Sequence, residues 1–170
     1  EYVIDKKALV VTAKDHTITY QDEASNAGVT YSGFVNSETN AVLSGVLAFD
    51  YDGYTQESNA GTYRITVSGL VSNNYSISYV AGLLTVEAMQ LNYSDYSFNY
   101  VGTEKFVYNG TAVVFEIQML PDFVQYDIVY KLNDETVVSE AVNAGSYTVT
   151  FVPKTSINYI FSGEVLKVPF

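Results

Sequence analysis

An aromatic stretch at residues 93–100 holds the side chains best suited to binding a ligand. Tyr93, Tyr96 and Tyr100 are spaced there among small polar residues, and Asp95 lies between the first two. Exposed rings of this kind stack on sugar rings, while nearby carboxylates and amides bind the hydroxyl groups. The same spacing is also typical of a strand with buried rings, or of a junction between domains. Tyr93, Tyr96 and Tyr100 are therefore candidate ligand-binding residues. The alternative is that their rings are buried and serve packing only.

Residues that could perform catalysis are present only as fragments of known arrangements. His16 is the single histidine and follows Asp15, but no nucleophile-elbow motif accompanies this pair. Adjacent acids at 22–23 and 134–135 could in principle exchange protons. Neighbouring residues of a strand point to opposite faces, however, and a small domain offers little cleft. We expect no catalytic residues and no enzyme activity.

The ligand set for a metal is equally incomplete. With no cysteine and one histidine, the chain lacks the side chains that hold zinc and other transition metals. The turn Asp50-Tyr51-Asp52-Gly53 is similar to the start of a calcium loop, but the further ligands and the closing Glu are missing. We expect neither a metal nor a cofactor.

Charge and hydropathy exclude two further classes of partner. Eight Lys and Arg residues against 19 Asp and Glu residues give a net charge of −11. Such a surface repels phosphates, so nucleic acid and anionic membrane surfaces are not expected partners. No apolar run approaches the roughly 18 residues of a membrane-spanning helix, so we expect no membrane insertion. Hydrophobic residues make up 48% of the chain, which predicts packed cores.

The elements that would position these side chains are strands. Tyr (16) and Phe (9) are abundant, and Thr and Val recur, which favours β structure. Apolar residues alternate with polar ones in the runs 63–67, 113–119 and 126–132. Within each run the apolar residues lie on one face of the predicted strand, at the odd-numbered positions of the first two runs and at the even-numbered positions of the third. Residues 8–13 lack this alternation and indicate a strand covered on both faces.

Turn signals separate the predicted strands. Asn109-Gly110 predicts a hairpin between residues 106–108 and the strand that begins at 113, and Asp52-Gly53 is a second candidate. Residues 36–44 alone favour a helix, because a capping Asn or Ser and an early acid precede Gly45. We expect at most one short helix there, of two to three turns.

An internal repeat divides the chain. Residues 59–63 read N-A-G-T-Y and residues 143–147 read N-A-G-S-Y, an offset of 143 − 59 = 84. Asn-Tyr recurs at the same offset, at 74–75 and 158–159. We interpret the repeated Tyr residues as core anchors whose hydroxyls reach the surface or a buried partner. The repeated glycines, Gly61 and Gly145, are predicted to need positive φ.

The first copy resembles the MBG-type domain of bacterial surface proteins over about residues 6–87. One departure stands out, because the family usually follows its Tyr with Gly and a nearby Pro, whereas Tyr20 is followed here by Gln21-Asp22. This departure concerns the loop at 21–28. The segments that carry the resemblance are 6–20, 31–36, 42–45, 59–67, 74–75 and 82–86.

The second copy is more divergent. Its segments 108–111, 143–151 and 158–159 resemble the broader set of MBG and immunoglobulin-like repeats, whereas residues 120–140 do not follow the first copy. We expect two tandem domains, 1–87 and 88–170, in which residues 1–5 could be the end of a preceding repeat. The resemblance implies a mostly β fold, either β-grasp-like or an immunoglobulin-like sandwich.

The resemblance also implies a function without catalysis. Such domains occur in tandem on secreted or wall-attached bacterial proteins, so we expect an extracellular, monomeric repeat that acts as an adhesin stalk, spacer or adhesive surface. Its expected partners are the neighbouring repeats of the same polypeptide and a host protein or glycan. The alternative is a carbohydrate-binding module that recognises host or dietary glycan through exposed Tyr and Phe rings.

Overall fold

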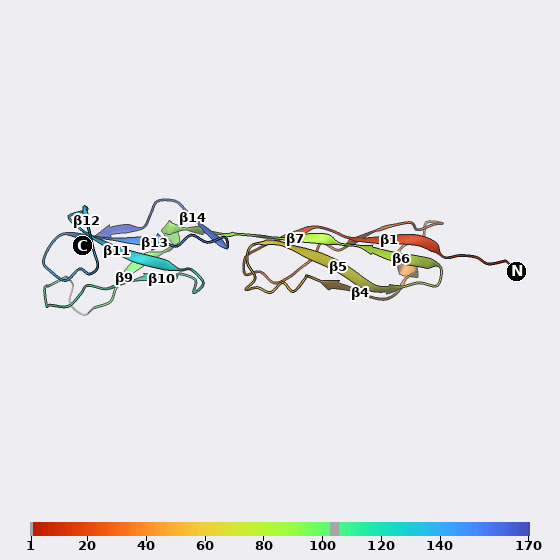
Figure 1. The fold of residues 1–170 in the computed structure, drawn as a ribbon, viewed down its shortest axis with the longest axis horizontal. Coiled ribbons are helices and arrows are strands. Elements are labelled where there is room, and N and C mark those ends of the chain that lie inside the picture. Colours follow the sequence, from red (N-terminus) through yellow and green to blue (C-terminus); the bar gives the residue numbers. More distant parts are fainter. Residues whose placement is uncertain (1, 103–105) are drawn as a thin grey trace. The chain divides into compact units, whose positions relative to one another are not determined.

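Two compact units make up the chain, Glu1–Ala88 and Met89–Phe170. The computed structural model describes residues 2–102 and 106–170 (Figure 1). Strands dominate both units, which confirms the mostly β fold class. Residues 1–5 were interpreted as the end of a preceding repeat. Residue 1 lies outside the described residues, and residues 2–6 are not in a strand.

Unit 1 is a sandwich of two sheets (Figure 1). One sheet has the order β3-β1-β6 and the other the order β2-β7-β5-β4. Two pairs are parallel, β1 with β6 and β2 with β7, and the other pairs are antiparallel. The strands are β1 (Lys7–Ala13), β2 (His16–Thr19), β3 (Val29–Ser32), β4 (Ser44–Asp50), β5 (Gly61–Val71), β6 (Tyr75–Val80) and β7 (Gly82–Glu87).

Alternating side chains from both sheets form the core of unit 1. Ile65 and Val67 of β5 are buried, as the period-2 pattern at 63–67 predicts. Leu9 and Val11 of β1 are fully buried from the other sheet. The prediction that residues 8–13 are covered on both faces is wrong, because Ala8 is exposed and the strand alternates between buried and partly exposed positions. The outward-facing positions Val10 and Thr12 are partly exposed.

Unit 2 contains a larger sheet and two smaller ones. The order β12-β11-β13-β15 forms a four-stranded sheet, and β10-β9 and β14-β8 are two-stranded. Val149 and Phe151 of β13 are fully buried, while Leu91, Val124 and Tyr159 form a separate buried cluster. The strands are β8 (Met89–Asn92), β9 (Ser97–Tyr100), β10 (Phe115–Gln118), β11 (Tyr126–Leu132), β12 (Thr136–Val138), β13 (Tyr147–Pro153), β14 (Tyr159–Ser162) and β15 (Lys167–Pro169).

The predicted strand at 113–119 is shorter than its sequence pattern. Strand β10 spans Phe115–Gln118, and Val113 forms only an isolated bridge with Ala141. Met119 was expected to face inward but is 87% exposed, with φ of 64°. A positive φ turns the chain out of the extended conformation, so the alternation ends before the last apolar residue.

The helix expected at 36–44 is a single 3₁₀ turn, η1 (Asn40–Val42). Asn36 and Ser37 do not cap it, because both adopt positive φ in a preceding turn, and Thr39 is the capping residue instead. A second such turn, η2 (Tyr93–Asp95), was not expected from the sequence. A β-grasp fold needs a longer helix, so the architecture follows the sandwich alternative within the described residues.

At the two positions predicted to be hairpins the chain does turn, but in neither case does a two-residue turn join two strands. Asp52 and Gly53 both have positive φ, but the next strand begins only at Gly61. Gly110 also has positive φ, and the side-chain oxygen of Asn109 accepts a hydrogen bond from the Thr111 amide (2.9 Å). Residues 106–108 are not a strand, so no hairpin forms at that turn.

The prediction that both repeated glycines need positive φ is confirmed for Gly61 and wrong for Gly145. Gly61 has a positive φ of 157°, whereas Gly145 does not adopt positive φ. A side chain at Gly61 would meet nothing within 4 Å, whereas one at Gly145 would approach the Leu132 side chain. The shared block therefore does not depend on a left-handed glycine.

Glycine is required instead at a β-bulge between β4 and β5. The register shifts between Gly45 and Ala48, and Gly45 and Gly69 have φ of 85° and 91°. A Cβ atom on Gly69 would lie 2.1 Å from the backbone oxygen of Val46, and one on Gly45 would lie 2.1 Å from that of Gly69. Both backbones approach closely because neither residue has a side chain.

We expect Gly69→Ala to lower the free energy of unfolding of unit 1 by at least about 2 kcal/mol, since it adds a backbone clash to a strained φ. Ser68→Ala, at the exposed neighbouring position of the same strand, is the control and should change it by less than about 0.5 kcal/mol. Urea denaturation followed by circular dichroism measures both variants. Equal effects of the two substitutions would contradict this account of the bulge.

Candidate functional site

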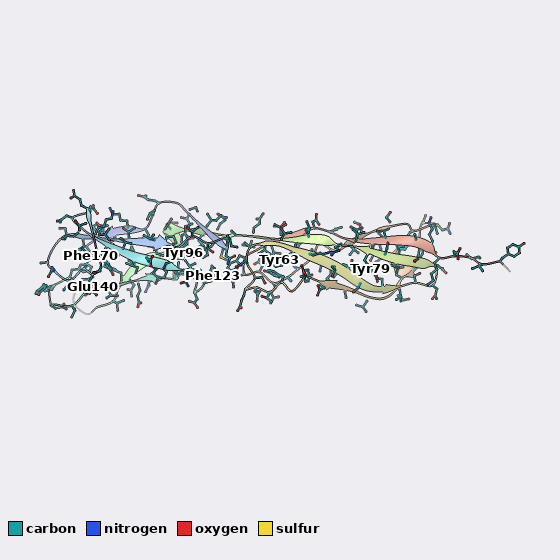
Figure 2. The ribbon with its side chains drawn as sticks, viewed as in Figure 1. Tyr63, Tyr79, Tyr96, Phe123, Glu140 and Phe170 are labelled. Carbon is teal, nitrogen blue, oxygen red and sulfur yellow. The ribbon has the colours of Figure 1, made fainter. Side chains whose placement is uncertain are left out.

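Two of the three candidate tyrosines lie together in unit 2. Tyr93, in η2, packs against Phe161 and Phe151, with ring centroids 5.0 and 5.9 Å apart. The Tyr96 ring, labelled in Figure 2, also packs against Phe161, at 5.8 Å. Burial, followed by the charge of Asp95, raises the pKa of Tyr96 above its usual value. Both rings are partly buried and contribute to the packing of this region.

Tyr100 belongs to a different aromatic cluster. Its ring packs against Phe106 and Phe115, at 5.1 and 5.9 Å, from the end of β9. The ring planes of both pairs are inclined by about 55°. The rings of Tyr93 and Tyr96 are inclined to that of Phe161 by 45° and 53°. The structure therefore places the three candidates in two clusters of tilted rings and not in one flat platform.

The second cluster borders a pocket that sequence reasoning missed. The pocket has a volume of about 290 Å³ and lies wholly in unit 2. The Phe170 ring (Figure 2) stacks on Tyr147 at its base, with centroids 5.6 Å apart and planes inclined by 19°. The lining residues are Phe106, Val107, Tyr108, Thr111, Val113, Ala141, Val142, Asn143, Ala144, Gly145, Tyr147 and Phe170.

The pocket offers rings and uncharged polar groups. Tyr108 and Val107 at its rim are 66% and 65% exposed. Asn143 and Thr111 contribute amide and hydroxyl groups, and none of the described lining side chains carries a charge. Small uncharged ligands with one apolar face suit such a surface. In the sequence, the aromatic residues at 106 and 108 beside a turn are the feature that could have pointed to this pocket. Only the folded structure places them next to the repeated Asn143–Tyr147 block.

The acidic turn at residues 50–53 is held by its own backbone. The Asp50 carboxylate accepts a hydrogen bond from the Asp52 amide (3.1 Å), which is a common turn geometry. Across residues 2–102 and 106–170, no three His, Cys, Asp or Glu side chains converge as they would around a metal ion.

His16 pairs with a serine, but the arrangement ends there. His16 Nε2 lies 3.0 Å from the Ser25 hydroxyl, and both side chains are at the surface. The Asp15 carboxylate accepts a hydrogen bond from the Leu83 amide (2.8 Å), which fixes the backbone at the end of β1. A catalytic triad needs an acid that orients the histidine ring. The pair instead joins the loop at 21–28 to β2.

The two acidic pairs also contain residues that fix turns. The Asp22 carboxylate accepts a hydrogen bond from the Thr19 amide (2.8 Å). The hydrogen bond that Thr148 Oγ1 donates, together with Lys167 at 3.0 Å, holds the pKa of Asp134 below its usual value. Asp134 thereby connects the turn after β11 to strands β13 and β15.

The repeated sequence blocks make the same hydrogen bonds in both units. The Tyr63 hydroxyl (Figure 2) donates to the Asn59 carbonyl at 2.7 Å, and the Tyr147 hydroxyl donates to the Asn143 carbonyl at 2.9 Å. Each bond spans four residues and closes the turn that precedes the strand. These bonds, and not the glycines, are what the two blocks share.

The second repeated block is also equivalent in the two units. The Ser72 hydroxyl accepts a hydrogen bond from the Asn74 amide (3.2 Å), and Ser156 accepts one from Asn158 (3.1 Å). The carbonyls of Asn74 and Asn158 then accept hydrogen bonds from the first strand of their own units, each at 2.9 Å.

The tyrosines of these blocks are anchors, as predicted. Tyr75, Tyr147 and Tyr159 are buried, and Tyr63 is partly buried. The Tyr159 hydroxyl accepts a hydrogen bond from the Gln125 amide (3.2 Å). The Tyr75 hydroxyl donates to Glu38, and this bond raises the pKa of Tyr75.

Comparison with known proteins finds a family match within unit 1. Residues 9–85 match the family model described as the MBG domain (YGX type). Domains of this family are repeat modules of surface proteins, and the family is not a known family of enzymes. No curated protein and no solved structure gives a significant match. Neither short helical turn of the described residues has the length or hydropathy to cross a bilayer.

The departure of this chain from the YGX motif has a structural explanation. Gln21 stands where the motif has glycine, and its φ of 77° lies in the left-handed region. Its carbonyl accepts a hydrogen bond from the Gln56 side chain (3.0 Å), while Tyr54 donates to the carbonyl of Asp22 (2.8 Å). The turn thus keeps the conformation that favours glycine, although the residue is different.

We expect Gln21→Gly to leave unit 1 as stable as before or to stabilise it by up to about 1 kcal/mol, since the relief of strain offsets the greater freedom of glycine in the unfolded chain. Thr17→Gly, in the adjacent β2, is the control and should destabilise by about 1 kcal/mol. Thermal and urea denaturation measure both changes. If Gln21→Gly destabilises as much as Thr17→Gly, the left-handed turn is not a source of strain.

Proposed function

We propose that this chain, whose first unit is an MBG domain, is a pair of non-catalytic repeat modules of a bacterial cell-surface or secreted protein. In this role the units space or present other parts of the same polypeptide, as the stalk of an adhesin does. Their principal partners are the neighbouring repeats. The chain acts as a monomer outside the cell.

The observation that carries this proposal is the repetition of the hydrogen bonds at an offset of 84 residues. Unit 1 matches the MBG model, and unit 2 makes the same bonds from Tyr147, Ser156 and Asn158. Bonds of this kind close the turns between strands, so matching bonds at matching positions indicate equivalent turns. We therefore interpret unit 2 as a divergent copy of the same module.

Three further features support a structural role. The chain contains no cysteine, so its buried cores hold together without disulfides. The net charge of −11 favours solubility and discourages self-association. The side chains that could perform acid-base chemistry, such as Asp22 and Asp134, are engaged in turns.

Antibodies raised against this fragment should label intact cells that produce the parent protein. A surface protease should also remove the signal without lysis, because a surface repeat is exposed to both reagents. The control is an antibody against a cytoplasmic protein, which should label lysed cells only. Labelling that requires lysis would contradict the extracellular role.

A second function is favoured by the aromatic pocket of unit 2. The stacked pair Tyr147–Phe170 and the exposed Tyr108 ring present apolar faces beside the polar groups of Asn143 and Thr111. Sugars bind to such surfaces by stacking and by hydrogen bonds to their hydroxyl groups. Under this proposal the module would also bind a host or dietary glycan. Tyr100 would support the pocket through its contact with Phe106, while Tyr93 and Tyr96 form a separate surface.

A glycan array probed with the 170-residue chain tests this second function. For any glycan that binds, Tyr108→Ala should weaken the affinity by about tenfold, which corresponds to about 1.4 kcal/mol. Tyr2→Ala removes a still more exposed tyrosine outside the pocket and should leave the affinity unchanged. If no glycan binds, or if both variants lose affinity equally, the pocket does not bind sugars. A loss with Tyr93→Ala or Tyr96→Ala alone would move the site to those rings.

A further inference from the structure

The first and the last strand segments of unit 1 lie side by side, and the chain enters the unit at one end of this pair and leaves it at the other. The first segment runs from β1 into β2, and the last segment runs from β6 into β7 (Figure 1). Lys7 lies opposite Tyr75 at one end, and Thr19 lies opposite Glu87 at the other. The segments are parallel, so a pull on the two ends of the unit drives them in opposite directions along their common axis.

Ten register pairs join these segments, six between β1 and β6 and four between β2 and β7. Further hydrogen bonds stand at both ends, from the Lys7 amide to Asn74 (2.9 Å) and from the Tyr20 amide to Glu87 (2.8 Å). The bonds of a parallel ladder run across the strands. A pull along the strands therefore loads them together, and none can break first without sliding the whole ladder.

We propose that this parallel ladder makes unit 1 a load-bearing module, which resists tension applied along the chain. The inference rests on the proposed function, because a repeat in a surface stalk carries tension from one neighbour to the next. It adds a property that the family match does not assign, namely that resistance depends on the direction of the pull.

Side chains and close backbone contacts strengthen the ladder where it crosses from one sheet to the other. Asp15, between β1 and β2, accepts the hydrogen bond from the Leu83 amide of β7. A Cβ atom on Gly82 would lie 2.8 Å from the carbonyl oxygen of Ala13, so the two segments approach closely there. At the start, the Lys6 amine donates to the Ser72 carbonyl (2.8 Å).

Sliding would also disrupt the core. Leu9 and Val11 of the first segment and Leu84 of the last are fully buried. A shift by one residue turns each of these side chains to the opposite face of its sheet. The hydrogen bonds and the hydrophobic core therefore oppose the same movement.

Unit 2 has a shorter version of this arrangement. Its parallel pair, β8 with β14, has four register pairs. Its last strand, β15, pairs with β13 in antiparallel fashion, and β9 pairs with β10. In the part of unit 2 that the structure describes, no ladder joins β9 to β15. Unit 2 should therefore unfold at a lower force than unit 1.

Single-molecule force spectroscopy on the full chain tests the proposal through the points of attachment. The chain contains no cysteine, so an introduced one is a unique handle. Pulling between the N-terminus and Glu87→Cys shears the ladder of unit 1. Pulling between the N-terminus and Asn73→Cys opens the same β1–β6 pair from one end, because Asn73 lies just before β6. Pulling between Glu87→Cys and the C-terminus loads unit 2.

The shearing pull should require at least about twice the force of the opening pull, since opening breaks one pair at a time. Unit 2 should unfold at a force between those two values. Equal forces in the two directions of unit 1 would overturn the proposal. A unit 2 as strong as unit 1 would overturn the assignment of strength to the length of the ladder.

A matched pair of variants separates mechanical from thermodynamic effects. Asp15→Ala removes a hydrogen bond between the two segments, whereas Asp50→Ala removes one within a turn outside the ladder. Asp15→Ala should lower the shearing force, and Asp50→Ala should not, even where urea denaturation finds similar losses of stability. Equal shearing forces for the two variants would count against the ladder. A strong unit 1 in a protein that is absent from the cell surface would contradict the proposed function alone.

Discussion

The parallel pairing of the first and last strand segments is the constraint on which unit 1 depends. It places β1 in the centre of its sheet, where Leu9 and Val11 reach the core. It also requires both segments to change sheets at the same level, which Gly82 permits because it has no side chain. Sequence neighbours could form none of these pairs, since about 70 residues separate the paired strands. The fold closes only when its two ends meet.

Tyrosine hydroxyls provide much of the remaining local order. A ring buries a large apolar area, and its hydroxyl can still reach a backbone group near the surface. Tyr79 exchanges hydrogen bonds with both backbone groups of Leu70, at 2.9 and 3.0 Å, and Tyr54 bonds the turn that follows β2. Each such bond contributes about 1 kcal/mol. The Tyr79 bonds join the neighbouring strands β5 and β6, and the Tyr54 bond joins segments that are 32 residues apart. In a small sandwich without disulfides, such bonds fasten a strand of one sheet to a strand of the other and a turn to the body of the unit.

The aromatic residues of unit 2 show how the same residue type serves two purposes. Tyr93 and Tyr96 pack on Phe161, whereas Tyr100 joins a cluster around Phe115. The stacked rings of Tyr147 and Phe170 come from a repeated block and from the last residue of the chain. The candidate site therefore lies where the repeated block meets elements that are not repeated. This difference between the units is consistent with one module that mainly spaces and one that could also bind.

The sequence by itself determined the class of the fold, the buried face of β5 and the repeated anchors, because these follow from local alternation and from blocks of matched residues. It also located the departure at Gln21, although not the positive φ that explains it. Tertiary structure decided the rest. Met119 turns outward, the helix near residue 40 shrinks to one turn, and the glycines that matter are Gly45 and Gly69. These outcomes, like the pocket beside Phe170, depend on which strands meet across the sandwich. Contacts between distant segments set backbone angles and burial there, and local sequence patterns carry no information about those contacts.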